Sequence, residues 1–256
     1  MLTLKRVSAG YDDADVLSDI SFTALPGDFL AILGTNGCGK TTLLRAMAGL
    51  LPYRGEVLLF ERPVARMKRR EIASHMAILA QSTGIYQPYS VYDTVMMGRY
   101  VHMRDRFFSE PSEEDRAVVR RYLETLDLLT LQNRSITELS GGQLQRVFLA
   151  RTLAQEPHII LLDEPTNHLD LRYQLELMHY LKTWVSEGKR AVIGVLHDVN
   201  LALQFANKGL ILHDGGMRSF GEMGKICTGT VLKEIYEVDV MEYMQVSLTR
   251  WQEFNQ

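Results

Sequence analysis

The sequence has little cysteine and no long hydrophobic run. Its 256 residues include only Cys38 and Cys227, which argues against a disulfide framework and fits a reducing compartment. The longest apolar runs, 159–162 and 191–196, have the length of strands and fall far below the ~18 residues of a membrane-spanning helix. The N-terminal segment lacks the apolar stretch of a signal peptide. We therefore expect a cytoplasmic protein that reaches any membrane through a partner.

The chain also lacks an excess of positive charge. It has 28 Lys and Arg against 31 Asp and Glu, a formal net charge of −3, which gives no overall reason to expect a nucleic-acid partner. The basic run Arg62–Arg70 is interpreted as a solvated surface, with nucleic-acid binding as the alternative. Hydrophobic residues make up 46% and charged residues 23%, as in a globular protein with a sizeable core.

Apolar strands alternate with helical segments along the chain. This alternation predicts an α/β protein in which a parallel sheet is covered on both faces. The expected strands are 2–11, 16–25, 29–34, 55–60, 76–81, 158–165, 190–198 and 208–216. Helices are expected to begin near Ser112 and Ser140 and to cover 172–188 and, as the one helix of the tail, 230–238.

A glycine-rich loop joins one apolar strand to a helix. Residues Gly34–Thr41, GTNGCGKT, match G-x-x-x-x-G-K-[ST] in the strand–loop–helix context that this pattern requires. The backbone N–H groups of such a loop, together with the N-terminal end of the helix, form a site for anions. We predict that Lys40 binds the β- and γ-phosphates of a nucleotide and that the Thr41 hydroxyl binds Mg²⁺. An ordinary glycine turn with a chance lysine is the alternative.

Cys38 lies inside this loop. The favoured interpretation is a small residue at a free position. The alternative is a reactive thiol, because Lys40 and a helix N-terminus both stabilise a thiolate. That hypothesis predicts inactivation by a maleimide at Cys38.

Two acidic residues, Asp163 and Glu164, follow the apolar run 159–162. In an open α/β sheet, ligands bind at the carboxyl ends of the strands. Asp163 can approach the Mg²⁺ held by Thr41, and Glu164 can polarise a water for attack on the γ-phosphate. Two solvated acids at a strand end would be the alternative if the glycine loop were absent.

A second glycine-rich stretch, LSGGQLQRVFLAR at 139–151, also begins a helix. It has the same suitability for phosphate as the first loop. Because one nucleotide already fills one loop, we infer that the second belongs to the nucleotide of another copy of the chain.

Together these stretches resemble the ATP-binding subunits of ABC transporters, over almost the whole chain. LSGGQ, Leu139–Gln143, is the signature of that family, and NHLD at 167–170 matches its dimer-linking loop. The resemblance implies a P-loop NTPase core with a parallel sheet, an N-terminal antiparallel β portion and a helical insertion. Residues 1–256 would form one ABC ATPase domain, divided into a nucleotide-binding core at 1–81 and 155–221, a helical subdomain at 82–154 and a tail at 222–256.

The resemblance also implies a role for each matching residue. Glu164 would be the catalytic glutamate, His197 the switch histidine that senses the γ-phosphate and Gln81 the glutamine of the Q-loop, with Lys40 as a fourth catalytic residue. Tyr11 would stack on adenine. The other ATP contacts would be Gly34, Thr35, Asn36, Gly37, Cys38, Gly39, Lys40, Thr41 and Thr42, and those to the partner's ATP would be Ser140, Gly141, Gly142 and Gln143. Mg²⁺ would be bound by Thr41, Gln81 and Asp163, and Asp170 would couple the two sites of the dimer.

The cofactors implied are ATP and Mg²⁺, and the partners are other protein chains. Two copies would sandwich two ATP molecules head to tail. The region 81–103, with Met96 and Met97, would contact two membrane-spanning permease subunits on the inner face of the cell membrane. A substrate-binding protein would take part indirectly, and no nucleic acid is expected.

Residues 90–103 and 197–216 resemble more narrowly the branch that serves import of iron–siderophores, haem and cobalamin. Val101 stands where that branch usually has proline. A subunit of an ABC exporter is the nearer alternative. A non-transport ABC ATPase acting on DNA or ribosomes is more distant, because such proteins usually carry long coiled coils, zinc modules or two cassettes in one chain.

Overall fold

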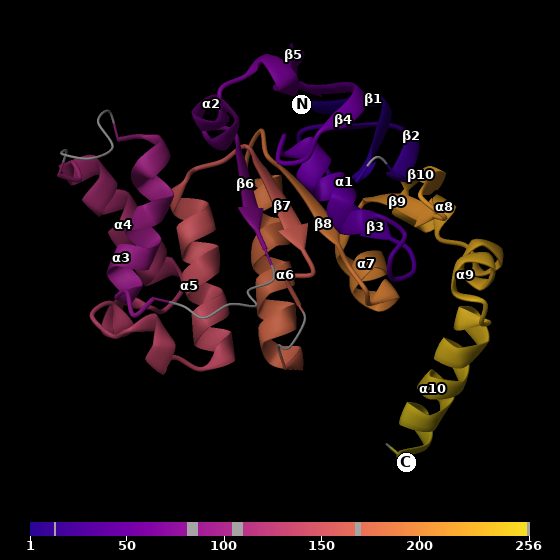
Figure 1. The fold of residues 1–256 in the computed structure, drawn as a ribbon. Coiled ribbons are helices and arrows are strands. Elements are labelled where there is room, and N and C mark those ends of the chain that lie inside the picture. The colour runs from indigo at the N-terminus through magenta and orange to yellow at the C-terminus, as the bar shows by residue number, and fades with distance from the viewer. Residues whose placement is uncertain (13, 81–86, 104–109, 167–169, 255–256) are drawn as a thin grey trace.

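Two sheets organise the chain (Figure 1). The structure, a computed structural model, describes residues 1–12, 14–80, 87–103, 110–166 and 170–254. The smaller sheet is antiparallel, with four strands in the order β2-β1-β4-β5. Its strands are β1 (Leu2–Tyr11), β2 (Ala14–Ala24), β4 (Tyr53–Leu59) and β5 (Arg62–Pro63). The expected N-terminal antiparallel portion is thereby confirmed.

The larger sheet has six strands in the order β10-β9-β3-β8-β7-β6. All neighbours pair in parallel except β9 and β10, which are antiparallel. The strands are β3 (Phe29–Leu33), β6 (Met76–Leu79), β7 (Ile159–Asp163), β8 (Ala191–Val195), β9 (Lys208–His213) and β10 (Gly216–Glu222). The sequence did not predict β10, because this edge strand is only partly buried and lacks an apolar run.

Helices surround the larger sheet and continue into a helical region. The helices beside the sheet are α1 (Lys40–Met47), α2 (Arg69–Ala73), α6 (Leu171–Ser186) and α7 (Val199–Phe205). The helical region contains α3 (Val91–Met96), the 3₁₀ helix η2 (Met97–Val101), α4 (Glu113–Thr125) and α5 (Gly141–Ala154). Both α4 and α5 begin with a capping box, at Ser112 and Ser140, as their sequences predicted.

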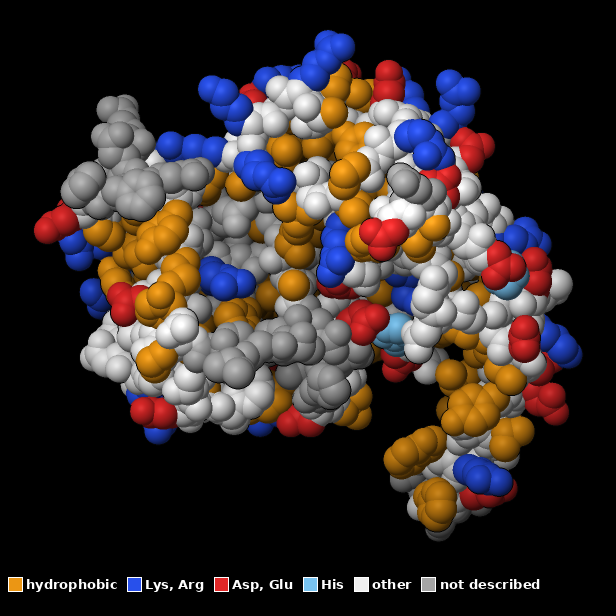
Figure 2. Space-filling view, viewed as in Figure 1, with side chains coloured by type: hydrophobic (Ala, Val, Ile, Leu, Met, Phe, Trp, Pro, Cys, Tyr) orange, Lys and Arg blue, Asp and Glu red, His pale blue; other side chains and the backbone are white. Residues whose placement is uncertain are grey.

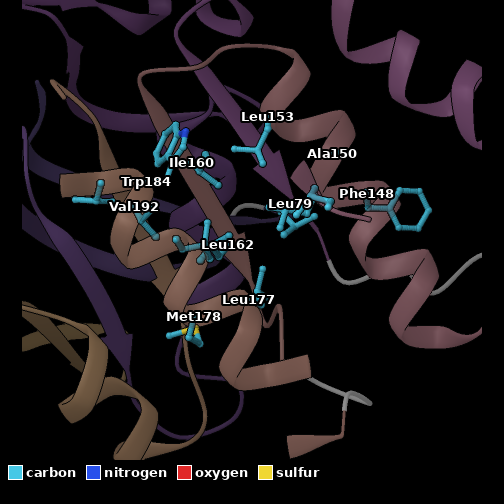
Figure 3. Packing of buried hydrophobic residues seen from close by; sticks show 14 of the residues in the cluster. Leu79, Phe148, Ala150, Leu153, Ile160, Leu162, Leu177, Met178, Trp184 and Val192 are labelled. Atoms are coloured by element: carbon cyan, nitrogen blue, oxygen red, sulfur yellow. The ribbon is translucent and has the colours of Figure 1, made fainter. Parts of the chain in front are cut away.

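The larger sheet separates two hydrophobic clusters. Along β3, Phe29, Ala31 and Leu33 face one cluster, while Leu30 and Ile32 face the other. The first cluster joins the sheet to α3–α6, and Figure 3 labels members of it from β6, β7, β8, α5 and α6. The second includes residues of the four-stranded sheet and α1. Burial on both faces explains why the central strands are nearly continuous apolar runs.

The tail differs from its prediction. One helix was expected after residue 222, whereas the structure has α8 (Met223–Ile226), α9 (Gly229–Tyr236) and α10 (Val240–Phe254). The predicted 230–238 segment corresponds to α9. Helix α10 has no buried residue and extends away from the body of the molecule (Figure 1). Within the described residues, no helix is long and apolar enough to cross a bilayer.

Candidate nucleotide-binding site

The glycine-rich loop lies between the buried strand β3 and helix α1. Two glycines fix its path. Gly34 has φ +149°, and a Cβ there would lie 2.4 Å from the carbonyl oxygen of Leu212. Gly39, the N-cap residue of α1, has φ +100°, and a Cβ there would lie 2.5 Å from Leu17 Cδ2. Only glycine fits such positions without strain, so the loop can pack closely against β9 and β2.

A cavity of about 540 Å³ opens above this loop. It is lined by Val16, Asn36, Gly37, Gly39, Lys40, Thr41, Thr42, Glu164 and His197. The structure therefore brings together residues from the glycine loop, the end of β7 and the end of β8, as expected at the carboxyl edge of a parallel sheet. Val16 was not predicted from the sequence, since a single valine at the start of a strand carries no signal.

Lys40 supplies the positive charge of the cavity. Its side chain is 5% exposed, and its ammonium donates hydrogen bonds to the carbonyl oxygens of Gly34 and Thr35 at 2.9 and 2.7 Å. No described carboxylate lies within ion-pair distance of this ammonium. An ammonium paired only with carbonyls retains its attraction for an anion.

Thr41, which lines the cavity, contacts Asp163 at the end of β7. The Thr41 hydroxyl donates a hydrogen bond to Asp163 Oδ1 at 2.9 Å. Burial raises the pKa of the Asp163 carboxyl above its ordinary value, although the bond from Thr41 opposes this effect. Two hard oxygen donors about 2.9 Å apart suit neighbouring positions around Mg²⁺, whose ligands lie at about 2.0–2.1 Å and at right angles. The residues present therefore fit a magnesium ion, which would also offset the cost of burying the carboxylate.

Glu164 and His197 form a second pair at the cavity. Glu164 follows β7 with φ +53°, a left-handed conformation that turns its side chain from the strand direction. His197 follows β8, and its Nε2 lies 2.6 Å from Glu164 Oε1. Both side chains are partly exposed and line the cavity. A carboxylate and an imidazole in contact beside a phosphate site can orient a water and move its proton.

Tyr11 lies outside the cavity. This residue ends β1 and is 42% exposed, and its hydroxyl accepts a hydrogen bond from Arg45 of α1 at 3.0 Å. Contact of Tyr11 with adenine remains a prediction. Val16 of the neighbouring strand β2 is the residue of this region that lines the cavity.

The reactive-thiol hypothesis for Cys38 is wrong. Its side chain is 6% exposed and belongs to the second hydrophobic cluster. Burial raises the pKa of the Cys38 thiol and outweighs the opposing charge of Lys40. The thiol packs toward the core instead of facing the phosphate position, so the small-residue interpretation holds. Burial likewise raises the pKa of Cys227.

The second glycine stretch does not line this cavity. Ser140 caps α5 and is exposed, with its hydroxyl accepting from the Gln143 N–H at 3.3 Å. Asp170 caps α6 and accepts from the Tyr173 N–H at 3.1 Å. Of the other predicted residues, Gln81 and 167–169 of the NHLD stretch lie outside the described residues.

Comparison with known proteins identifies many relatives. The family model described as ABC transporter matches residues 17–167. A siderophore transport system ATP-binding protein of Bacillus subtilis is 35% identical, over 93% of this chain and 86% of the relative. The iron(3+)-hydroxamate import ATP-binding protein of the same organism is 33% identical, over 93% of this chain and 88% of the relative.

Comparison with solved structures also finds related ATP-binding cassettes. An inward-facing metal-chelate type ABC transporter matches with a TM-score of 0.82 at 31% identity, over 93% of this chain and 89% of the other. The dimeric, post-hydrolysis structure of the ATP-binding cassette MJ0796 with ADP and Pi matches with a TM-score of 0.76 at 27% identity, over 87% and 99% of the two chains.

Proposed function

The chain belongs to the ABC transporter family of ATPases, and we propose that it is the ATP-hydrolysing subunit of an importer for iron chelates such as siderophores or haem, or for cobalamin. The catalytic part rests on one observation: Lys40, Thr41, Glu164 and His197 line a single cavity, and Thr41 is hydrogen-bonded to Asp163. The transport systems named for its relatives support import of an iron chelate.

The cavity assigns separate tasks to its residues. Lys40 and the loop N–H groups bind and orient the phosphates of ATP. Thr41 and Asp163 would hold a magnesium ion that, when bound, neutralises charge on the β- and γ-phosphates. Glu164 accepts a proton from the water that attacks the γ-phosphate, and the leaving group is ADP. His197, in contact with Glu164, orients that carboxylate and senses the γ-phosphate.

A second copy of the chain completes each site. Proteins of this family dimerise, as in the dimeric cassette structure above. Residues Ser140–Gln143 lie at the exposed N-terminal end of α5 and outside the cavity of their own protomer. We assign them to the ATP of the partner, in a head-to-tail sandwich. Asp170 at the start of α6 would then couple the two sites.

A groove between α2 and η2 is suited to the permease subunits. Its volume is about 570 Å³, and its lining includes Arg70, Met97, Tyr100 and Met103. Arg70 donates to the carbonyl oxygens of Val101, at 2.8 Å, and of Met103, so the two walls are joined. Tyr100 is 56% exposed. An apolar groove with an aromatic anchor and a positive wall is typical of a protein–protein interface.

Copurification from the native membrane tests this proposal. The tagged protein should retain permease subunits, and cells carrying Lys40→Ala should lose uptake of a labelled ferric siderophore. Met97→Glu should lose the permease and keep Mg-dependent ATPase activity. Met217→Glu on β10, 37% exposed and outside the groove, is the matched control. Normal uptake of every iron chelate and of cobalamin in the Lys40→Ala strain would contradict the importer assignment.

A further inference from the structure

Arg99 is a buried arginine that the proposed mechanism does not use. Lys and Arg side chains gather at the surface over α2 (Figure 2), whereas Arg99 of η2 is 3% exposed. Burying a guanidinium is costly unless carboxylates and carbonyls satisfy its N–H groups. A side chain held at such a cost, directly beside the groove assigned to the permease, calls for a functional explanation.

The Arg99 side chain joins η2 to two other helices. Its Nε donates a hydrogen bond to Asp115 Oδ1 of α4 at 2.9 Å. Its Nη1 donates to the carbonyl oxygen of Ala154, the last residue of α5, and to Glu156 Oε2, both at 2.8 Å. Burial opposes ionisation of the Asp115 carboxyl, but hydrogen bonds from Ser112 and Arg99 hold its pKa below the ordinary value. The guanidinium therefore faces an ionised carboxylate on one side and the end of α5 on the other.

The neighbours of Arg99 contact the same end of α5. Gly98 packs there so closely that a Cβ would lie 2.2 Å from the carbonyl oxygen of Arg151. The His102 Nε2 lies 2.9 Å from the carbonyl oxygen of Gln155. The last carbonyls of a helix lack partners within the helix, and a positive charge is favourable beside them. Gly98, Arg99 and His102 thus form a clamp on the C-terminal end of α5.

The same segment forms a wall of the groove assigned to the permease. Met97, Tyr100 and Val101 line that groove, together with Gln155, which follows α5. The Gln155 side-chain amide donates to the Ala73 carbonyl of α2 at 2.6 Å, so the end of α5 also contacts the facing wall. A protein segment seated in the groove touches η2, and the clamp fixes η2 to α5.

Helix α5 connects the clamp to the residues assigned to the partner's ATP. Its fourteen residues give a length of about 21 Å, with Ser140–Gln143 at the far end. A capping box holds its first turn and the clamp holds its last. A helix fixed at both ends moves as one body, so a displacement at the groove also displaces Ser140–Gln143.

We propose that Arg99 is a positioning residue for ATP hydrolysis in the assembled transporter: through α5, it places Ser140–Gln143 according to what occupies the permease groove. This inference rests on the proposed function, which supplies the permease and the partner's ATP. Arg99 itself lines neither the groove nor the nucleotide cavity. In the isolated subunit the groove is empty, so its ATPase activity does not depend on Arg99.

Arg99→Lys tests this role. Lysine keeps the positive charge but has one nitrogen in place of the guanidinium, so it cannot satisfy all three partners at once. In the complex copurified with its permease, uptake and ATPase activity should fall roughly fivefold or more, the low end of typical coupling between two sites. The isolated subunit should keep the wild-type ATPase rate and ATP affinity. A merely structural role would instead lower both rates together with the Tm.

Three further variants sharpen the comparison. His102→Ala removes the exposed bond of the clamp; it should fold as the wild type does and show the same split to a smaller extent. Arg121→Gln removes a second arginine bound to Glu156, at 2.9 Å, but leaves the clamp in place, so the complex should keep its uptake and ATPase rates. In a Met97→Glu background, which should lack the permease, Arg99→Lys should cause no further change.

The outcomes separate this inference from the proposed function. A wild-type chain that retains no permease would overturn the proposed function and this inference with it. Where the wild type retains its permease and supports uptake, the inference alone fails if neither Arg99→Lys nor His102→Ala shows the split between complex and isolated subunit. It also fails if Arg121→Gln shows an equal one.

Discussion

At the scale of single residues, the catalytic role proposed for Glu164 can be tested by one substitution. Glu164→Gln keeps the shape of the side chain and its contact with His197 but removes the group that accepts the proton. We expect turnover to fall ~10²–10⁴-fold, equivalent to about 3–5 kcal/mol of barrier, with ATP binding retained. An ATP-bound dimer should then accumulate, visible by gel filtration. Glu187→Gln, at the exposed end of α6, is the control, and a near-normal rate for Glu164→Gln would remove Glu164 from its role.

Replacement of Asp163 should change stability and ATPase activity in opposite directions. Burial raises the pKa of its carboxyl, so the ionised form destabilises the free protein at neutral pH. Asp163→Asn should therefore raise the Tm, while ATPase activity falls about 10²–10³-fold, the range for losing one group that stabilises transition-state charge. Asparagine can still accept the bond from Thr41.

The pH dependence of this Tm difference has a defined sign. The folded state binds the Asp163 proton more tightly than the unfolded chain does. As the pH falls through the raised folded-state pKa, the carboxylate is neutralised and the wild type approaches the stability of Asp163→Asn. Thermal unfolding of both proteins between pH 4 and 7 measures how the Tm difference depends on pH. A difference that widens toward acid pH would show that burial of the charge is not the cause.

At the scale of elements, α5 and α6 are linked beside the nucleotide cavity. The Gln145 side-chain amide of α5 donates to the Pro165 carbonyl at 3.0 Å, directly after Glu164. Gln174 of α6 donates to the Thr166 carbonyl at 3.1 Å. The chain between β7 and α6 is thus tied to both helices, so a change at Glu164 can reach residues Ser140–Gln143 of the same protomer, which we assign to the other site.

Tyr173 sets how closely the N-terminal ends of α5 and α6 approach. A Cβ at Gly142 would lie 2.8 Å from the Tyr173 ring, so Gly142→Ala must displace this ring or the helices that carry the two residues. We expect a loss of about 1–3 kcal/mol of unfolding free energy, as for other overpacked contacts. Combining it with Tyr173→Ala should leave a smaller loss than the sum of the two single changes.

Gly141→Ala is the matched control for this contact, because nothing lies within 4 Å of a Cβ at Gly141. It should be neutral or stabilise by a few tenths of a kcal/mol, since alanine favours the helix. Denaturant unfolding of the four variants gives the comparison. If Gly141→Ala and Gly142→Ala lower the unfolding free energy equally, the destabilisation comes from the backbone and not from the contact with Tyr173.

At the scale of the whole molecule, the sandwich can be tested by mixing two inactive proteins. Ser140→Arg should fill the space that we assign to the partner's γ-phosphate, while Lys40→Ala should disable the phosphate loop. In a mixed dimer one site carries both changes and the other carries neither. Recovery of up to roughly a quarter of the wild-type rate is expected, since about half of the dimers are mixed and each has one complete site.

Each protein alone provides the control for the mixing experiment. Ser140→Arg should still bind ATP as a monomer, because Ser140 lies outside the cavity of its own protomer. Loss of that binding, or an absence of recovery on mixing, would indicate a site made within one chain.

The sequence by itself determined the fold class, the phosphate loop and the acidic pair. These depend on local patterns: a buried strand of 29–33, glycines ahead of a helix, and two acids after an apolar run. Local chemistry acts over a few residues, so it can be recognised before the chain is folded. The order of motifs in the resemblance to ABC ATPases added roles that spacing alone could not assign.

Only the tertiary structure decided which groups meet and which are buried. The sequence could not show that Cys38 turns into the core, that Val16 of β2 closes the nucleotide cavity, or that Glu164 touches His197. Nor could it show that α10 leaves its apolar face exposed, because the same pattern predicts a helix packed on its own core. Burial and long-range contact depend on the positions of all elements at once, and no local stretch contains that information.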